Sequence, residues 1–273
     1  MWKHDDTDDV SLRRRGVFGS PAEREKRREY LHKKTEEALK ALDAAMTEVS
    51  GACGTQMLDE EQALKMRDEN LFLWICSMMK IAGTGLDISD VAHLMNKEEI
   101  DIQADTEIYR LLEACKKLYT EFLHMLDLDF YLNERYIIYI NETLTGKVYD
   151  EYRTKNISLR TTGYPTPRAD HVPGLMVELS FEIMNEFHGE NEITNAIYAH
   201  DKIMQIWPFK SRNRETAYAV LSFMLFKAGY PLLTLDIDDT EHKRLLIEKD
   251  PLESESEFML LVVESLLKQV RPR

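Results

Sequence analysis

The sequence predicts an almost entirely α-helical protein with one short β-hairpin. Apolar residues recur at helical spacing along most of the chain, as at Leu39, Leu42 and Met46. The best signal for strands is residues 156–168, where Gly163 and two prolines favour a hairpin. With 273 residues, of which 44% are hydrophobic, the chain can form one large domain with a sizeable core.

The N-terminal part is expected to consist of a flexible arm followed by a basic helix. Residues 1–20 are polar and include three consecutive arginines, which is typical of a loosely attached segment. Ser20 as N-cap, Pro21 at the first helical position and Glu23 at the third form a capping box that starts a helix. We expect the helical segment to occupy residues 21–55 and residues 56–273 to form the helical domain.

Charge is distributed unevenly along the chain. The net charge is −14, yet residues 13–34 hold nine Lys or Arg and only three Glu. The basic stretch from Glu23 to Lys34 is interpreted as a solvated helix face packed against the acidic remainder of the chain. The alternative is a docking surface for an acidic protein, for RNA or for a second copy of the chain. The acidic remainder argues against broad binding of nucleic acid.

Helical periodicity predicts further helices in the rest of the chain, over residues 59–79, 88–97, 106–126, 173–187, 193–206, 216–228, 241–249 and 254–270. In the first of these, the stripe that includes Trp74, Met78 and Met79 is interpreted as core rather than as a ligand pocket. The β-branched run at residues 137–140 would by itself indicate a strand.

Several classes of protein are excluded by the sequence. No apolar run approaches the roughly 18 residues of a membrane span, and the polar N-terminus does not resemble a secretion signal. The three cysteines show no metal-ligand spacing, and Cys76 and Cys115 are expected to be reduced core residues. We find no P-loop, nucleophile-elbow or zinc motif. A cytoplasmic location is therefore expected by default.

The most informative stretch is residues 207–215, a tight loop between two apolar helices. It reads Trp-Pro-Phe-Lys-Ser-Arg-Asn-Arg-Glu. The loop opens onto the N-terminus of the second helix, where unpaired backbone N–H groups and the helix dipole suit an anionic ligand.

This stretch resembles the loop of the Fic (Fido, or Fic/Doc) family, whose motif is H-P-F-x-[D/E]-G-N-G-R-x-x-R. The similarity extends to residues 195–206 before the loop and residues 227–231 after it. Residues 160–176 resemble the flap of the family and the segment that follows it, and roughly residues 70–270 are covered in all. The resemblance implies a helical Fic fold with a hairpin flap, and it favours a helix over residues 135–146.

The active-site motif is degenerate in this chain. Trp207 stands where the family has the histidine that takes a proton from the target hydroxyl, and Ser211 stands where an acidic residue holds magnesium. Phosphate-contacting glycines and arginines of the family are replaced by Arg212, Arg214, Glu215 and Tyr218, and only Pro208, Phe209 and Asn213 match. We therefore predict no catalytic residue, no metal ligand and no cofactor.

Two hypotheses are open for the polar side chains of the loop. Lys210, Arg212, Asn213 and Arg214 could hold an anion, because guanidinium groups bind phosphate in a bidentate manner. Alternatively, Arg212 and Arg214 fill the former groove and pair with local acids.

Two other segments carry expectations from the resemblance. In the family, the flap aligns a target segment as an added strand, and the corresponding positions are Leu159, Arg160, Thr161, Thr162 and Gly163. Ala82 and Gly83 fall at the end of the segment where many family members carry an inhibitory motif, and Ala82 replaces its glutamate.

Three functions are compatible with these observations. The first is a catalytically silent Fic-fold protein that binds a protein partner through the flap or the basic helix at residues 23–34. The second is a transferase with altered chemistry, which would use ATP and magnesium, with Glu215 or Asp201 as a base. The third is a structural subunit with a filled groove. His200, two helical turns before Trp207, is interpreted as structural.

Overall fold

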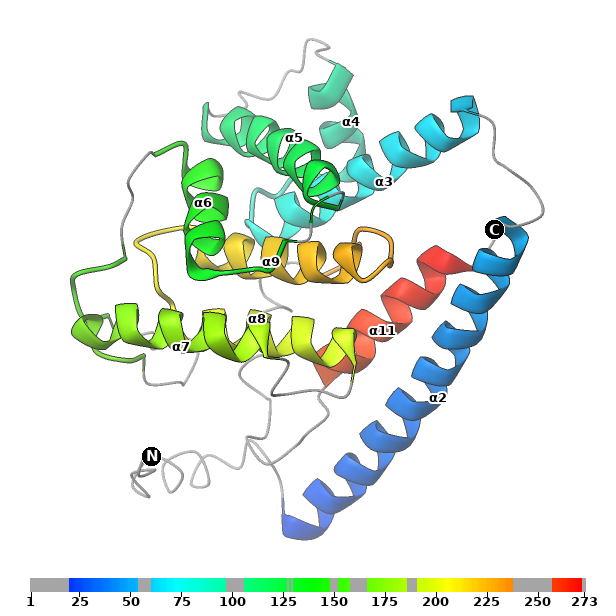
Figure 1. Cartoon of the computed structure of the whole chain (residues 1–273), viewed down its shortest axis with the longest axis horizontal. Helices are drawn as coiled ribbons and strands as arrows, with labels where there is room; N and C mark the ends of the chain where they lie inside the picture. The colour runs from blue at the N-terminus through cyan, green and yellow to red at the C-terminus, as the bar shows by residue number, and fades with distance from the viewer. Residues whose placement is uncertain are drawn as a thin grey trace.

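The computed structural model describes residues 20–53, 60–96, 106–126, 128, 130–147, 152–157, 166–185, 191–237 and 257–271 (Figure 1). The elements are α2 (Pro21–Cys53), α3 (Glu60–Ile81), α4 (Ile88–Asn96), α5 (Thr106–Leu126), α6 (Glu134–Thr145), the 3-10 helix η1 (Ala169–His171), α7 (Val172–Met184), α8 (Glu192–Ile206), α9 (Asn213–Lys227) and α11 (Glu257–Val270). No strand occurs in these residues. The prediction of an all-α protein is confirmed.

Helix α9 lies at the centre of the fold. It packs against α3, α5, α6 and α8 (Figure 1). Every side chain from Thr216 to Phe223 is at most 1% exposed. A helix that is buried on all sides has no need of a polar face, which explains the apolar sequence of this segment. The loop before α9 is therefore attached to the most enclosed helix described.

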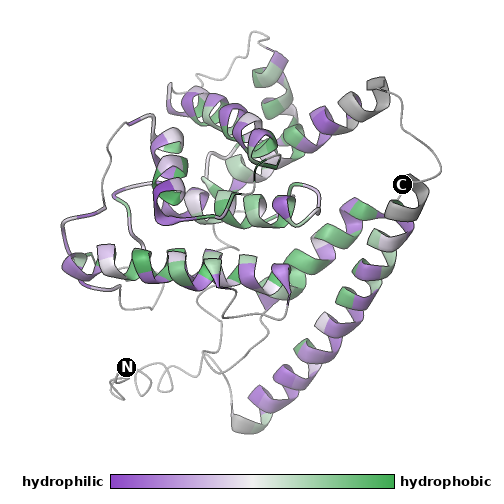
Figure 2. Cartoon of the chain, viewed as in Figure 1, coloured by the Kyte–Doolittle hydropathy of each residue, from purple (hydrophilic) through white to green (hydrophobic). Residues whose placement is uncertain are grey.

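The outer helices complete the core around α8 and α9. Helix α7 packs on α8, α4 packs on α3, and α11 packs between α2 and α8. Figure 2 shows α2 mostly in hydrophilic colours and α11 mostly in hydrophobic ones. Leu31 and Leu42 of α2 are buried. The long N-terminal helix thus contributes a narrow apolar stripe and exposes a wide polar face.

The capping box predicted at the start of α2 is confirmed. The backbone N–H of Ser20 donates to the Glu23 carboxylate at 2.6 Å, and the N–H of Glu23 donates to the Ser20 hydroxyl at 3.3 Å. The bonds from Ser20 hold the pKa of Glu23 below its ordinary value. Two backbone donors at the helix start are satisfied in this way.

Helix α6 forms despite the β-branched run at residues 137–140. Asn133 caps its start by accepting from the N–H of Tyr136 at 3.1 Å, and Gly146 ends it in a left-handed conformation with φ of 66°. Ile137 and Ile140 are fully buried. Local caps and burial outweigh the strand preference of these residues, and the helix expected from the family resemblance is confirmed.

Several predicted boundaries differ from the observed ones. Helix α3 ends at Ile81 instead of residue 79, and α7 ends at Met184 instead of residue 187. Helix α9 begins at Asn213, three residues before the predicted start. The reason for this early start lies in the loop contacts described below.

Two cysteines and the stripe of Met and aromatic side chains on α3 belong to the core, as predicted. Cys76 and Cys115 are buried free thiols, and Trp74, Met78 and Met79 are fully buried. Burial raises the pKa of Cys76 to about 11 and moves that of Cys115 still further above its ordinary value.

Some predictions lie outside the described residues. They are the arm up to residue 19, the helix at 241–249, and the flap positions Leu159, Arg160, Thr161, Thr162 and Gly163. The two ends of the flap segment are described. The hydroxyl of Thr166 donates to the carbonyl of Ile157 at 2.6 Å, and the N–H of Ala169 donates to the Asn156 side chain at 2.8 Å. The ends therefore lie close together, and the hairpin between them stays a prediction.

Candidate functional site

The loop between α8 and α9, residues 207–212, turns the chain with two left-handed residues. Trp207 ends α8 with φ of 48°, and Arg212 precedes α9 with φ of 58°. Residues other than glycine adopt this left-handed conformation at a steric cost, because their Cβ atom crowds the backbone. The resemblance described above aligns Arg212 with a glycine of the family motif. The loop thus keeps a glycine-like backbone while carrying a long cationic side chain.

The Asn213 side chain stabilises the loop through two hydrogen bonds to the backbone of Phe209. Its side-chain oxygen accepts from the N–H of Phe209 at 2.8 Å, and its side-chain nitrogen donates to the carbonyl of Phe209 at 2.9 Å. Asn213 is 2% exposed and Phe209 is 1% exposed. This pair fixes the chain at the start of α9, which explains why the helix begins here. The amide predicted to contact an anion has its oxygen and one N–H engaged within the loop.

Asn141 and Thr216 hold the other side of the loop. The Asn141 amide donates to the carbonyl of Ser211 at 3.0 Å and to the hydroxyl of Thr216 at 2.9 Å. The Thr216 hydroxyl in turn donates to the carbonyl of Arg212 at 2.6 Å. Sequence reasoning missed Asn141, although a signal exists, since it is an amide on the apolar face of α6 beside Ile137 and Ile140.

The charged side chains of the loop form an ion-pair cluster. Arg212 lies 2.8 Å from the carboxylate of Glu215 and 3.5 Å from that of Glu107 in α5. Glu215 is 4% exposed. Lys210 is exposed, and Arg214 is half-buried. Of the two hypotheses for the loop, pairing with local acids describes the geometry of Arg212, while anion binding by the loop stays a prediction.

The other positions that the sequence analysis predicts to be degenerate lie in different surroundings. Trp207 is half-buried against the hydrophobic core, and Ser211 is exposed. Tyr218 is fully buried and donates its hydroxyl to the carbonyl of Leu233. Burial raises the pKa of Tyr218. Its ring therefore belongs to the core rather than to the loop surface.

Ala82 and Gly83 follow the end of α3. Ala82 packs against the core, and Gly83 adopts φ of 70° in the turn that follows the helix. The N–H of Gly83 donates to the carbonyl of Lys80 at 3.0 Å. This segment closes a helix, and Ala82 has no carboxylate that could reach the loop.

Arg153 joins the loop to both ends of the flap segment. Its guanidinium donates to the carbonyls of Trp207 at 2.9 Å, Lys155 at 3.1 Å, Pro167 at 2.6 Å and Ile206 at 3.4 Å. Its own N–H donates to the carbonyl of Pro208 at 2.8 Å. Arg153 is 4% exposed, and burial lowers its pKa. The carbonyl end of α8 favours this positive charge.

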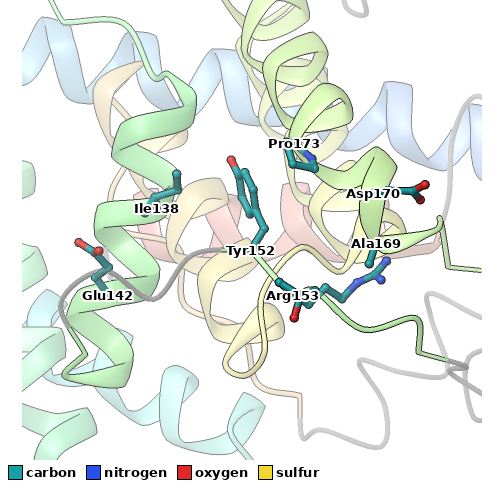
Figure 3. Close-up of a pocket in the computed structure, with 8 residues that line it drawn as sticks. Ile138, Glu142, Tyr152, Arg153, Ala169, Asp170 and Pro173 are labelled. Atoms are coloured by element: carbon teal, nitrogen blue, oxygen red, sulfur yellow. The ribbon is translucent and has the colours of Figure 1, made fainter.

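A pocket of about 600 Å³ opens beside the loop. It is lined by Ile138 and Glu142 of α6, by Tyr152, Arg153 and Thr154, and by Ala169, Asp170 and Pro173 at the start of α7. The Tyr152 ring lies between Ile138 and Pro173, and Glu142 and Asp170 lie on opposite rims (Figure 3). Tyr152 also packs on Phe209, with ring centroids 5.6 Å apart. Sequence reasoning identified neither Arg153 nor this pocket.

His200 and Asp201 form a buried pair on α8. The ring of His200 is fully buried, and its Nδ1 lies 3.0 Å from the Asp201 carboxylate. The ring also stacks on that of Phe258 in α11, with ring centroids 4.6 Å apart. Asp201 is 5% exposed. The pair connects α8 to α11, in agreement with a structural role for His200.

Two general findings concern the described part of the chain. It holds no cluster of three or more His, Cys, Asp or Glu side chains that could bind a metal ion. None of the helices described in it has the length and apolar character needed to cross a membrane.

Comparison with known proteins identifies the class to which this fold and loop correspond. Residues 131–225, from just before α6 into α9, match the model of the Fic/DOC family. The resemblance of the chain to this family is thereby confirmed. A comparison with curated proteins finds no match.

Solved structures extend the similarity over most of the chain. A Fic-domain-containing signalling protein from Bacteroides thetaiotaomicron is 15% identical with a TM-score of 0.65, over 87% of this chain and 95% of that one. A fragment of Fic-1 from C. elegans is 15% identical with a TM-score of 0.66, over 88% and 70% of the two chains. A Fic family protein from Desulfovibrio desulfuricans is 19% identical with a TM-score of 0.60, over 85% and 73%. Because the sequence identities are this low, the structural similarity shows that the chain has the Fic fold and shows nothing more specific.

Proposed function

We propose that this is a catalytically silent Fic-fold protein that acts by binding a protein partner. The observation that carries the proposal is the ion pair between Glu215 and Arg212 at the N-terminus of α9. The Glu215 carboxylate is buried in the first turn, where the helix dipole favours negative charge. The chain places its own anion in the region that would otherwise attract a phosphate group.

The rest of the loop supports the same proposal. The indole of Trp207 carries an N–H donor and no acceptor, so it cannot act as a general base. The side chain of Arg212 occupies a position where the family motif has glycine, and its guanidinium pairs with two carboxylates. The loop lacks a base at Trp207, carries a bulky side chain at Arg212 and holds an internal anion at Glu215. Each of these features opposes transfer of a nucleotide to a target hydroxyl.

The loop residues do not fit a magnesium ion. Mg²⁺ is bound in proteins chiefly by carboxylate and phosphate oxygens. The acidic position of the motif is Ser211, whose hydroxyl carries no charge, and the nearby Glu215 carboxylate is held by Arg212 at 2.8 Å. The alternative of a transferase that uses ATP and magnesium is therefore weakened.

The proposed bases of that alternative are poorly placed as well. Glu215 is 4% exposed and pairs with Arg212, and Asp201 is 5% exposed and pairs with His200. A general base must come within hydrogen-bonding reach of the proton that it removes. Burial of both carboxylates argues against either one meeting a hydroxyl of a target protein.

Titration calorimetry with MgATP tests the proposal. We expect no saturable heat from the parent protein, because the Glu215 carboxylate lies at the start of α9 and engages Arg212. The Glu215→Gln variant should gain measurable affinity, while Glu264→Gln on the exposed face of α11 should behave like the parent. Saturable binding by the parent that is lost in Arg212→Ala would contradict the proposal and favour the altered transferase.

A further inference from the structure

The pocket beside the motif loop has a volume of about 600 Å³ and is formed by separate parts of the chain. They are α6, the residues from Tyr152 to Thr154, and the start of α7 (Figure 3). Volumes of about 300–1,000 Å³ are typical of pockets that enclose a small-molecule ligand. The pocket is therefore large enough to hold a whole molecule, and the function proposed above makes no use of it.

Apolar groups form much of the pocket wall. The Tyr152 ring lies between Ile138 of α6 and Pro173 of α7 (Figure 3), and Ala169 adds a further apolar side chain. The Tyr152 hydroxyl donates to the Glu134 carboxylate at 2.7 Å, so the polar end of this side chain is already engaged. The ring remains as a surface on which an aromatic ligand can pack in an offset or edge-on arrangement.

Each charged residue of the described lining has a partner. The Arg153 guanidinium donates to the backbone carbonyls described above. The Asp170 carboxylate accepts hydrogen bonds from Arg168 at 3.1 and 2.9 Å, and Glu142 has a partner as well. A charged ligand would lose its hydration in this pocket without gaining a free counter-charge, which is unfavourable. The pocket therefore suits an uncharged ligand.

Thr154 adds a hydrogen-bonding group to the pocket. It lines the pocket and is exposed, and its hydroxyl makes no hydrogen bond within the part of the chain that the structure describes. A threonine hydroxyl can both donate and accept, as can a hydroxyl on a ligand. A few polar groups in an apolar pocket fix the orientation of the molecule that binds there.

We propose that this pocket binds a small uncharged aromatic molecule that carries a hydroxyl group. The ring of the ligand packs on Tyr152 between Ile138 and Pro173, and its hydroxyl forms a hydrogen bond with Thr154. Tyr152 also packs on Phe209, with ring centroids 5.6 Å apart, so the ligand lies beside the motif loop without entering it. This site does not depend on the binding of a protein partner.

Three probes that share one ring and differ in charge test the proposal. Benzyl alcohol is uncharged, benzoate carries a carboxylate, and benzylamine carries an ammonium group at neutral pH. Titrations followed by ligand-observed NMR measure their affinities. We expect saturable binding of benzyl alcohol and binding at least about tenfold weaker for both charged probes, because neither finds a free counter-charge.

Two variants locate the binding. Pro173→Asp places a charge in the apolar wall and should weaken binding of benzyl alcohol at least about tenfold. Asp is favourable in the first turn of a helix, so α7 should still form. Thr154→Val keeps the shape of the side chain without its hydroxyl and should weaken binding by about fivefold, the effect of one hydrogen bond.

Val177→Asp is the matched control. Val177 is 55% exposed on α7, one turn after Pro173, and does not line the pocket. This variant introduces the same charge on the same helix, and it should bind benzyl alcohol as the parent does. All three substituted residues are exposed, so each variant should keep the circular dichroism of the parent.

Several results would overturn the proposal. They are no saturable binding of benzyl alcohol, equal or tighter binding of a charged probe, no loss in Pro173→Asp, and an equal loss in Val177→Asp. Tighter binding of N-acetyl-tyrosinamide than of benzyl alcohol would assign the pocket to a tyrosine side chain of a partner instead. No nucleotide is present in these assays, so their failure leaves the silent-loop proposal intact. Binding of MgATP would overturn that proposal without affecting this one.

Discussion

At the scale of single residues, Arg153 organises the candidate site. Its guanidinium contacts the end of α8, the motif loop and both ends of the flap segment, all through backbone carbonyls. No carboxylate lies within ion-pairing distance of it in the described part of the chain. The fixed fork of donors on arginine suits such a set of acceptors, whereas the single ammonium of lysine cannot reach them all.

We predict that Arg153→Lys lowers the free energy of unfolding by at least about 2 kcal/mol, because buried carbonyls lose their donors. Urea unfolding followed by circular dichroism measures the change. Arg168→Lys is the matched control, since Arg168 is exposed and pairs with Asp170 at the surface; its effect should be within about 0.5 kcal/mol. Equal stability of Arg153→Lys and the parent would show that the carbonyl contacts contribute little.

At the scale of elements, the helix starts depend on local capping. In α2, the capping box keeps the pKa of Glu23 low in the folded state. Because the pKa of Glu23 is lower in the folded state, the carboxylate stabilises the fold at pH values above its unfolded-state pKa. This stabilisation is lost as the pH falls through the folded-state pKa. The contribution of Glu23 therefore exists at neutral pH and disappears in acid.

We predict that Glu23→Gln melts below the parent at neutral pH and that the difference shrinks as the pH falls below the ordinary range for Glu. Thermal melts of both proteins across this range measure it. Glu25→Gln, on the same helix and outside the capping box, serves as control. A difference between Glu23→Gln and the parent that is independent of pH would mean that the carboxylate charge is not what stabilises the helix start.

The sequence predicts the helices well because their determinants are local. Periodicity located most of them, and the Ser20 and Glu23 pattern identified the start of α2. The early start of α9 was missed because it depends on Asn213 binding Phe209 and on Asn141 reaching from α6. Arg153 was missed for the same reason, since its partners are distant in the sequence. Contacts made only after folding leave no periodic signal.

At the scale of the whole molecule, the Fic fold is kept at low sequence identity. Core packing around α9 is continuous, and TM-scores of 0.60 to 0.66 accompany identities of 15 to 19%. Tyr218, which the resemblance aligns with a phosphate-binding arginine of the family, is fully buried, and its hydroxyl donates to the carbonyl of Leu233. An arginine restored there would be a buried charge in the core.

In the proposed silent site, the loss of catalysis is distributed over several residues. A general base contributes roughly 10²–10⁴-fold, and only when the donor is already positioned. Under this proposal, Ser211, Arg212, Glu215 and Tyr218 each oppose that positioning. Because they act on one bound geometry, a single reversion at Trp207 cannot restore the whole.

The most direct test of the central claim is transfer of label from ATP to protein. The parent and Trp207→His are incubated with ATP labelled on the α-phosphate, magnesium and a cell lysate, beside an active Fic enzyme as positive control. We expect no labelled protein above background with either form. Label on protein with the parent, lost in the Arg212→Ala variant, would contradict the claim that the site is silent.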